Sequence, residues 1–259
     1  MGFAQLTDGE LHYDLTGPEN APVLVLSNSL GTDLGMWDAQ IPAFSKYFRV
    51  LRLDTRGHGK SLVTKGPYTI EQLGHDVLAL FNRLNIQKAH FCGLSMGGLI
   101  GQWLAIHAND RLHKLVLCNT AAKIASPEVW NPRIEMVLRD GLSGLREGTV
   151  TRWFTPEYVA AHPQEVERLT GMLLNTSPEG YAANCAAVRD ADFRKQLGDI
   201  TAPTLVICGT QDPVTTIVDG QFLHNHITGS EFSEFHAAHL SSVELGEVFT
   251  LRVLAFLLS

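Results

Sequence analysis

Cys92-Gly93-Leu94-Ser95-Met96-Gly97-Gly98 is the stretch from which the rest of the chain can be interpreted. An apolar, strand-like run over 89–92 precedes it, and apolar residues recur at helical spacing over 99–108. A serine with glycines two positions before and after it, between a strand and a helix, is typical of a nucleophile elbow. So tight a turn strains the serine backbone, and only small neighbours let the strand and the helix approach each other. The pattern predicts a nucleophilic Ser95, with an idle serine in a glycine-rich turn as the alternative.

A nucleophilic serine needs a base to take its proton, and the base needs a third group to orient it. On an elbow of this kind the chain order is serine, acid, histidine. Asp212 follows an apolar run over 204–208 and is the expected acid, with an ordinary Asp-Pro turn as the alternative. His239 is the expected base, because it lies between a predicted last strand over 232–235 and an apolar closing helix. His236 competes with it, but we expect that residue to belong to the end of the strand.

Acyl transfer also requires two N–H donors that bind the developing oxyanion. One comes from the residue after the nucleophile, which is Met96, and the other from the loop after an early strand. The loop over 27–31 directly follows the buried run over 23–26, and we expect Leu30 to supply the second donor. The sequence therefore offers a complete set of groups for serine-based hydrolysis.

Apolar runs and helical patterns alternate along most of the chain, which predicts a doubly wound α/β sheet with mostly parallel strands. We expect an opening hairpin over 3–6 and 10–15 and later strands over 23–26, 50–53, 90–92, 115–118, 204–208 and 232–235. Helices are expected over 36–46, 70–84, 99–107 and 243–258. From 121 to 199 no apolar strand run occurs, and the segment reads as helices broken by Pro127, Pro132, Pro156, Pro163 and Pro178. We interpret it as a helical cap inserted into a core domain formed by residues 1–120 and 200–259.

Composition narrows the function classes. The chain has 259 residues, 45% of them hydrophobic, and a formal net charge of −7 without any run of Lys or Arg, which argues against nucleic acid as a partner. Neither a signal peptide nor an apolar run of the ~18 residues needed to span a membrane is visible. Three of the four cysteines, Cys92, Cys118 and Cys208, stand at the ends of apolar strand-like runs and are expected to be buried free thiols, and we expect a cytoplasmic protein. No metal is expected, because His236 and His239 lack a neighbouring acid and a third ligand. No dinucleotide fingerprint is present, so no cofactor is expected, and the oligomeric state is left open.

Further motifs of the sequence resemble those of a known protein family. Asp54-x-Arg56-Gly57-x-Gly59-x-Ser61, the elbow, and the acid and histidine after the cap together resemble the α/β-hydrolase superfamily, over essentially the whole chain. Most members carry His-Gly at the oxyanion loop, whereas this chain has Asn28-Ser29-Leu30-Gly31, followed by Met36-Trp37-Asp38. This variant, with Trp130-Asn131-Pro132-Arg133 and Arg152-Trp153-Phe154-Thr155-Pro156, is similar to the 3-oxoadipate enol-lactonases of aromatic catabolism.

The resemblance implies cofactor-free hydrolysis of a small anionic lactone through an acyl-enzyme, as in the β-ketoadipate pathway. Trp130, Trp153 and Arg133 would then bind substrate, with Arg133 on the carboxylate, because the net charge repels an anion and a local cation must compensate. Arg152, Arg56 and Arg189 compete for that role, and each could instead be a surface or structural arginine. The alternatives are a carboxylesterase, a carbon–carbon bond hydrolase or a cofactor-free perhydrolase with the same three residues, or a ligand receptor on this fold.

Overall fold

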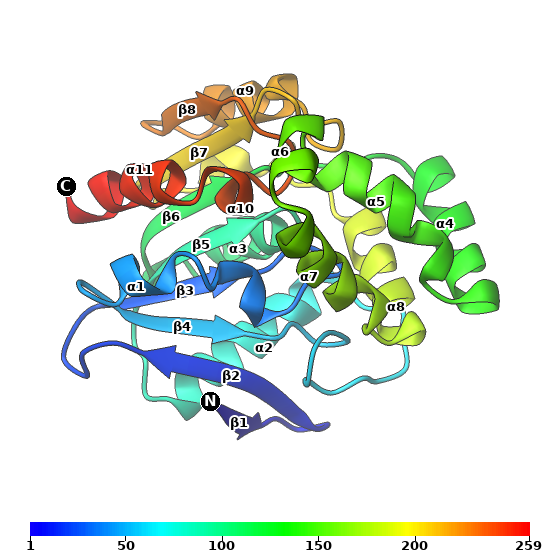
Figure 1. The fold of residues 1–259 in the computed structure, drawn as a ribbon. Helices are drawn as coiled ribbons and strands as arrows, with labels where there is room; N and C mark the ends of the chain where they lie inside the picture. The colour runs from blue at the N-terminus through cyan, green and yellow to red at the C-terminus, as the bar shows by residue number, and fades with distance from the viewer.

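The computed structural model describes residues 1–259, and its centre is one eight-stranded sheet (Figure 1). The strand order is β1-β2-β4-β3-β5-β6-β7-β8; β1 pairs antiparallel with β2 and β2 with β4, and every other neighbouring pair is parallel. This confirms the predicted α/β fold with a mostly parallel sheet. The strands are β1 (Gly2–Gln5), β2 (Glu10–Thr16), β3 (Val23–Ser27), β4 (Arg49–Leu53), β5 (Ala89–Leu94), β6 (Leu112–Cys118), β7 (Thr204–Gly209) and β8 (Glu231–Phe235).

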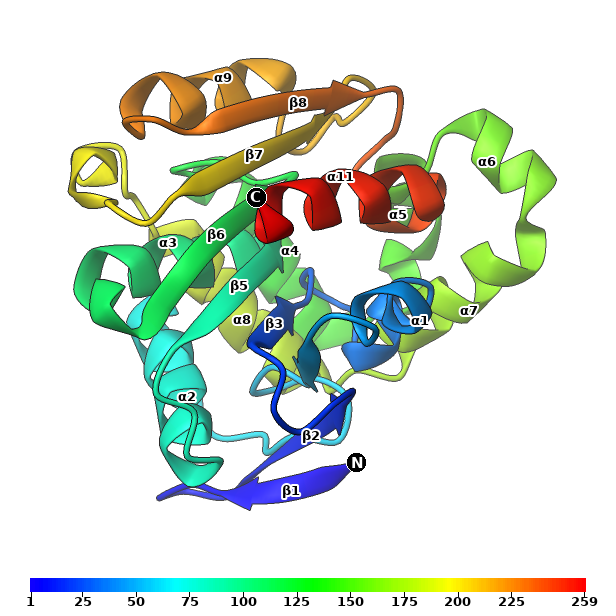
Figure 2. The ribbon, with the colours of Figure 1, turned by 90° about the vertical axis from the view of Figure 1, so that its left-hand side faces the viewer.

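Helices cover both faces of the sheet. Figure 2 shows α2, α3 and α9 on one face and α1 and α11 on the other, so the central strands are buried on both sides. Every residue of β5 is buried, which explains why that strand reads as continuously apolar in sequence. No helix combines the length and the apolar character that a membrane span requires. The α-helices outside the segment between β6 and β7 are α1 (Ile41–Phe44), α2 (Ile70–Arg83), α3 (Met96–His107), α9 (Ile217–His226), α10 (Ser241–Leu245) and α11 (Glu247–Leu258).

Five helices lie between β6 and β7, beyond the carboxyl ends of the parallel strands (Figure 1). We refer to them as the cap: α4 (Pro127–Asp140), α5 (Arg146–Trp153), α6 (Pro156–Ala161), α7 (Pro163–Leu174) and α8 (Pro178–Asp190). Four of the five prolines stand in the first turn of a helix, where the missing N–H has no intrahelical partner. Pro132 differs from the expectation, because it lies inside α4 and does not end it. Cap and sheet share one continuous cluster of buried apolar side chains.

Two predicted helices are divided in the structure. The helix expected over 36–46 is a short 3-10 turn, η1 (Leu34–Trp37), followed by α1. Pro42 has no N–H to donate to the carbonyl of Asp38, so a continuous helix would lose a bond there. The helix expected over 243–258 is divided into α10 and α11 at Gly246, whose φ of +45° is outside the helical region.

Close packing at the elbow explains its glycines. A methyl group on Gly97 would lie 2.3 Å from the carbonyl oxygen of Ser27, and one on Gly93 would lie 2.2 Å from the carbonyl oxygen of Gly97. Real Cβ atoms do not approach backbone this closely, so β3, β5 and α3 can meet here only if these positions lack side chains. The sequence pattern is therefore a steric requirement of the turn that presents Ser95.

We expect Gly97→Ala to lower the free energy of unfolding by about 1–3 kcal/mol, because the added methyl must push backbone apart. Gly171→Ala is the matched control: that glycine lies within α7, and nothing lies within 4 Å of an added Cβ. It should raise the stability by about 0.5–1 kcal/mol, since alanine is the better helix former. Urea unfolding of both variants checks the prediction. Equal stabilities for Gly97→Ala and the wild type would mean that strand and helix do not approach as described.

Candidate active site

Ser95 lies in the one-residue gap between β5 and α3. Its backbone is strained, with φ +58° and ψ −114°, which is rare for a residue that carries a side chain. The neighbouring strand end holds the backbone there: Ser95 N–H donates to the carbonyl of Cys118 at 2.9 Å, and Thr120 Oγ1 donates to the carbonyl of Ser95 at 2.8 Å. The elbow is thus fixed by β6 as well as by its own glycines.

Ser95, His239 and Asp212 form one hydrogen-bonded array. Nε2 of His239 lies 2.9 Å from Ser95 Oγ, and Nδ1 of the same ring lies 2.8 Å from Asp212 Oδ2. An ionised carboxylate can only accept, so Nδ1 carries the proton and Nε2 presents its lone pair to the serine hydroxyl. All three side chains are buried, with Ser95 exposed by 6% where it borders a cavity. The geometry is that of a serine whose proton can pass to an oriented imidazole.

Asp212 is held as a carboxylate by its surroundings. Burial opposes its ionisation, but electrostatic attraction to the His239 ring and hydrogen bonds from His239, Asn119 and Val214 outweigh it and lower the pKa of Asp212. Asn119 Nδ2 donates to Asp212 Oδ2 at 2.9 Å and to the carbonyl of Ala238 at 3.1 Å. Sequence reasoning missed Asn119. Its place directly after an apolar strand was the available signal, because the carboxyl ends of parallel strands meet at the site.

The loop that carries His239 is bonded to the cap. His239 N–H donates to the carbonyl of Arg152 at 3.3 Å, and Leu240 N–H donates to the carbonyl of Trp153 at 3.0 Å. His236 lies one residue beyond β8 and is exposed, so it is not part of the array. The structure thus brings the cap segment around Trp153 and the histidine loop together.

The loop after β3 presents a free backbone donor beside Ser95. The carbonyl of Ser29 accepts from Thr32 N–H at 3.2 Å and from Thr32 Oγ1 at 2.8 Å. In a trans peptide the N–H points opposite to the carbonyl, so the Leu30 N–H points away from Thr32. This N–H has no hydrogen-bond partner in the protein, and both Ser29 and Leu30 line the cavity that Ser95 borders. Met96 N–H, the other expected donor, stands at the first position of α3, where helical N–H groups lack an internal acceptor.

A cavity of about 260 Å³ lies between Ser95 and the cap. Its walls combine apolar and aromatic side chains with a few polar groups, as in sites that bind small molecules. The cap contributes Trp130 and Trp153, both buried, together with Tyr181. The structure brings together no group of three His, Cys, Asp or Glu side chains that could hold a metal ion.

Two arginines of the cap, Arg133 and Arg152, line this cavity. The guanidinium carbon of Arg133 lies 4.9 Å from the centre of the Trp130 ring, so both are on one face of α4, as helical spacing predicts. Arg152 donates to Thr149 Oγ1 at 3.0 Å. Burial, and then the charge of Arg133, lowers the pKa of Arg152. Neither guanidinium is paired with a carboxylate. The cavity therefore holds two adjacent cations without counter-ions.

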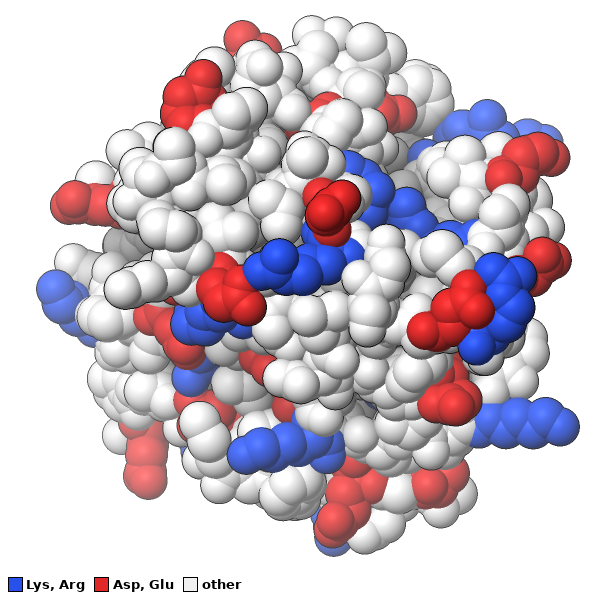
Figure 3. All heavy atoms as spheres, turned by 45° about the vertical axis from the view of Figure 1, so that its right-hand side comes forward, with Lys and Arg blue, Asp and Glu red and all other residues white.

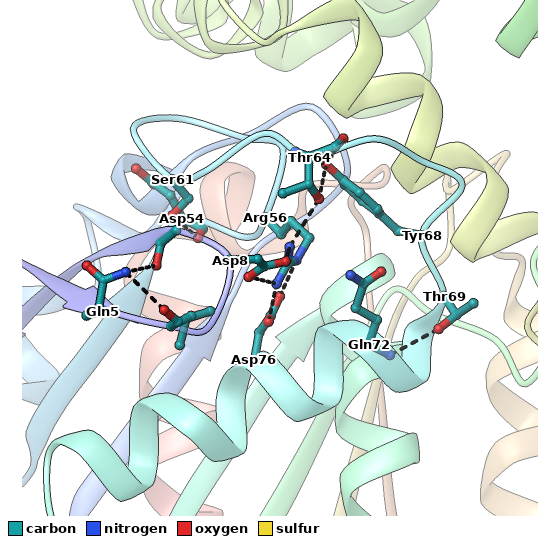
Figure 4. A network of polar contacts seen from close by, with 12 residues as sticks. Gln5, Asp8, Asp54, Arg56, Ser61, Thr64, Tyr68, Thr69, Gln72 and Asp76 are labelled. Carbon is teal, nitrogen blue, oxygen red and sulfur yellow. Dashed lines mark hydrogen bonds and ion pairs between the residues drawn. The ribbon is translucent and has the colours of Figure 1, made fainter.

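The other two candidate arginines are engaged elsewhere. Arg56 is buried and bonded to Asp8 and Asp76, with Oδ2 of Asp76 2.7 Å from its Nε, as Figure 4 shows. Arg189 donates to Asp190 and to Asn131 Oδ1, and it is not among the residues that line the cavity beside Ser95. Arg56 is a structural arginine, and Arg189 belongs to the outer surface of the cap.

Comparison with known proteins gives concordant results. A family model described as alpha/beta hydrolase fold matches residues 22–244. The chain is 48% identical to 3-oxoadipate enol-lactonase 2 of Acinetobacter baylyi, over 95% of this chain and 92% of that protein, and 45% identical to enol-lactonase 1 of the same species, over 92% and 90%. The crystal structure of an enol-lactonase from Burkholderia xenovorans LB400 superposes with a TM-score of 0.98 at 47% identity, covering 100% of both chains.

Proposed function

The chain belongs to the α/β-hydrolase family, and we propose that it hydrolyses 3-oxoadipate enol-lactone to 3-oxoadipate through an acyl-enzyme on Ser95. One observation supports this most strongly: two cations without counter-ions, Arg133 and Arg152, line the cavity that contains Ser95. The enol-lactone joins an activated ester to a carboxylate on one small molecule. Relatives named for this reaction, which match more than nine tenths of the chain, support the same conclusion.

Acylation begins when Ser95 Oγ attacks the lactone carbonyl carbon and its proton passes to Nε2 of His239. Asp212 stabilises the imidazolium that forms and keeps the ring in the required tautomer. The carbonyl oxygen becomes an oxyanion, which the N–H groups of Leu30 and Met96 bind in a site already free of competing partners. Collapse of the tetrahedral intermediate breaks the ring C–O bond, and the proton on His239 passes to the departing enol oxygen.

The leaving group of a lactone stays attached to the acyl chain. The enol tautomerises to a ketone, which is a poor nucleophile, so the ring cannot readily close again. Water then attacks the ester carbonyl on Ser95 while His239 takes its proton. As the second tetrahedral intermediate collapses, its bond to Ser95 Oγ breaks and His239 returns the proton to that oxygen. The net reaction consumes one water and yields 3-oxoadipate. The acyl carbon that was bound to Ser95 becomes the second carboxylate of this product.

The acetate arm of the substrate would lie against the two cap arginines. Acidic and basic side chains are interspersed over the cap side of the molecule (Figure 3), so this face has no broad patch of positive side chains. Recognition of an anion must then come from inside the cavity. A planar guanidinium can bind a carboxylate through two N–H groups. The bound carboxylate would also relieve the repulsion between Arg133 and Arg152.

We expect Arg133→Met to lower kcat/KM for the enol-lactone by about ten- to a hundredfold, which corresponds to the ~1.5–3 kcal/mol of a charge-assisted hydrogen bond. Methionine keeps much of the aliphatic stem and removes the charge. Arg152→Met should act in the same direction, and the double variant should lose more than either single one. Steady-state kinetics on the lactone, followed through its ring absorbance, provide the measurement.

The control is a neutral substrate of similar size, the methyl ester of the same lactone. Its kcat/KM should hardly change in either variant, because no carboxylate is present to lose. An equal loss on the lactone and on its methyl ester would show that the substitution disturbed the cap, and would remove the support for carboxylate recognition. Arg189→Met, outside the cavity, should leave both substrates unaffected.

We also propose that the protein works in the cytoplasm. All four cysteines are buried free thiols, and the Sγ atoms of Cys92 and Cys118 lie 3.8 Å apart without a bond between them. Buried cysteines without disulfide partners are typical of proteins in a reducing compartment.

A further inference from the structure

His58 is a buried histidine outside the catalytic array that contacts the oxyanion loop. It lies in the loop over 54–61 that follows β4 and is only 2% exposed. Burial lowers the pKa of His58 to about 4, so the ring is neutral near neutral pH. The loop that carries it is closed on itself, since Ser61 Oγ donates to the carbonyl of Asp54 at 2.6 Å (Figure 4). The proposed mechanism so far gives this ring no role.

The contacts of His58 define its tautomer. Nε2 accepts a hydrogen bond from Gly31 N–H at 2.9 Å. A neutral imidazole has one acceptor nitrogen, so the proton must be on Nδ1, which faces the carbonyl of Arg56 at 3.5 Å. Asn184 Nδ2 also lies 3.4 Å from Nδ1, but its two protons go to the carbonyls of Arg56 and Gly180, so Nδ1 does not have to accept from it. In the imidazolium form Nε2 would carry a proton and would face the Gly31 N–H as a second donor. The loop geometry described here therefore requires neutral His58.

Gly31 follows Leu30, and two adjacent peptide groups of this loop are held by different partners. Thr32 binds the carbonyl of the Ser29–Leu30 peptide, and His58 binds the N–H of the Leu30–Gly31 peptide. Together these contacts determine the orientation of Leu30 between them. They also engage the Gly31 N–H, whereas the Leu30 N–H has no partner in the protein.

We propose that His58 is a positioning residue that aims the Leu30 N–H at the oxyanion by accepting the N–H of Gly31. The inference rests on the acyl transfer proposed above, though not on the identity of the substrate. Without the acceptor, Gly31 loses a buried hydrogen-bond partner and the Leu30–Gly31 peptide is no longer held. Leu30, whose own N–H belongs to the preceding peptide, is then fixed on the Thr32 side alone. The oxyanion is then bound less well, whereas the ground state, which has no full charge on this oxygen, is little affected.

The loop that carries His58 also contacts the cap. Asn184 on α8 donates to the carbonyl of Arg56 at 2.7 Å, two residues before His58. Gly57 and Gly180 pack so closely that a Cβ on Gly180 would lie 2.4 Å from the carbonyl oxygen of Gly57. The loop of His58 is therefore in contact with α8 on one side and with Gly31 on the other.

The test compares His58→Leu, His58→Gln and His90→Leu. Leucine removes the acceptor, whereas the Oε1 of glutamine can still accept from Gly31. His90 is the matched control, because it is also buried and burial lowers its pKa to about 4 as well, but it lies at the far end of β5 from Ser95. With 4-nitrophenyl acetate as the probe, we expect His58→Leu to lower kcat about ten- to a hundredfold with little change in KM. This is less than the ~10²–10³ lost when an oxyanion donor is removed outright.

A second measurement separates oxyanion binding from general damage. Phenylboronic acid forms a tetrahedral adduct with an active serine, and its affinity should fall in parallel with kcat in His58→Leu. His58→Gln should recover most of both losses, and His90→Leu should change neither by more than about twofold. Unchanged kcat and boronate affinity in folded His58→Leu, or equal losses in His90→Leu, would overturn the proposal.

The wild-type protein offers a test that needs no variant. A ¹H–¹⁵N spectrum of the histidine rings should show His58 as the neutral form with its proton on Nδ1, from pH 7 down to pH 5. A proton on Nε2, or an imidazolium in that range, would also overturn the proposal. Because these readouts use a nitrophenyl ester, a boronate and the free protein, they remain valid even if the enol-lactone is not the substrate.

Discussion

Ser95→Ala is expected to lower kcat by a factor of about 10⁴ to 10⁶ and to leave the fold intact. The hydroxyl contributes little to packing, since it faces the cavity and its protein contact is with His239. Alanine removes the attacking oxygen, so the remaining rate enhancement comes from the oxyanion site and from binding alone. The elbow backbone is held by Cys118 and Thr120, whose contacts do not involve the side chain of Ser95.

The measurement is kcat on the enol-lactone and on 4-nitrophenyl acetate, with circular dichroism to show that the variant is folded. The two substrates should lose activity alike, because the same nucleophile acts on both. A variant that kept a tenth of the wild-type kcat would show that Ser95 is not the nucleophile.

His239→Ala should be about as damaging as Ser95→Ala, and the double variant should be little worse than either. Such non-additivity is the mark of residues that act as a unit, here through the 2.9 Å contact between Nε2 and Oγ. His236→Ala is the matched control, three residues away on the same loop. It should stay within about tenfold of wild type, because His236 is exposed beyond β8.

Kinetics of the three variants on one substrate check this prediction. If His236→Ala proved the damaging change and His239→Ala the mild one, the loop after β8 would be arranged differently from the structure described here. If the losses in Ser95→Ala and His239→Ala multiplied in the double variant, the two residues would not act on the same proton.

The elbow could be predicted because its signal is local. Gly93, Ser95 and Gly97 must be small or strained within a single turn. The strand before them is predicted by its continuous apolar run, and the helix after them by apolar residues at helical spacing. The positions of Asp212 and His239 followed from element order, since Asp212 stands beyond the apolar run over 204–208 and His239 beyond the predicted last strand over 232–235. Even so, the boundaries of the helices around Gly246 and Pro42 could not be predicted from periodicity alone.

The roles of residues that contact partners distant in sequence could not be predicted from the sequence. Asn119 and His58 show this, because their roles depend on which strands lie side by side and on which way a loop turns. The arginines show the same limit. Arg56 is structural because Asp8 and Asp76, 48 and 20 residues away in sequence, meet it in the fold. Arg152 lacks such acidic partners, and no pattern in its own neighbourhood distinguishes the two.

The most direct test of the proposed function is the rate at which catalytic amounts of the purified protein consume 3-oxoadipate enol-lactone, with 4-nitrophenyl acetate assayed alongside. We expect many turnovers per protein, a kcat/KM of about 10⁴ M⁻¹s⁻¹ or higher, and 3-oxoadipate as the product. If the protein hydrolysed the nitrophenyl ester while the lactone disappeared at its uncatalysed rate, the chain would be an esterase of another specificity. Consumption of a single lactone per protein would instead indicate a receptor, and either result would contradict the function proposed here.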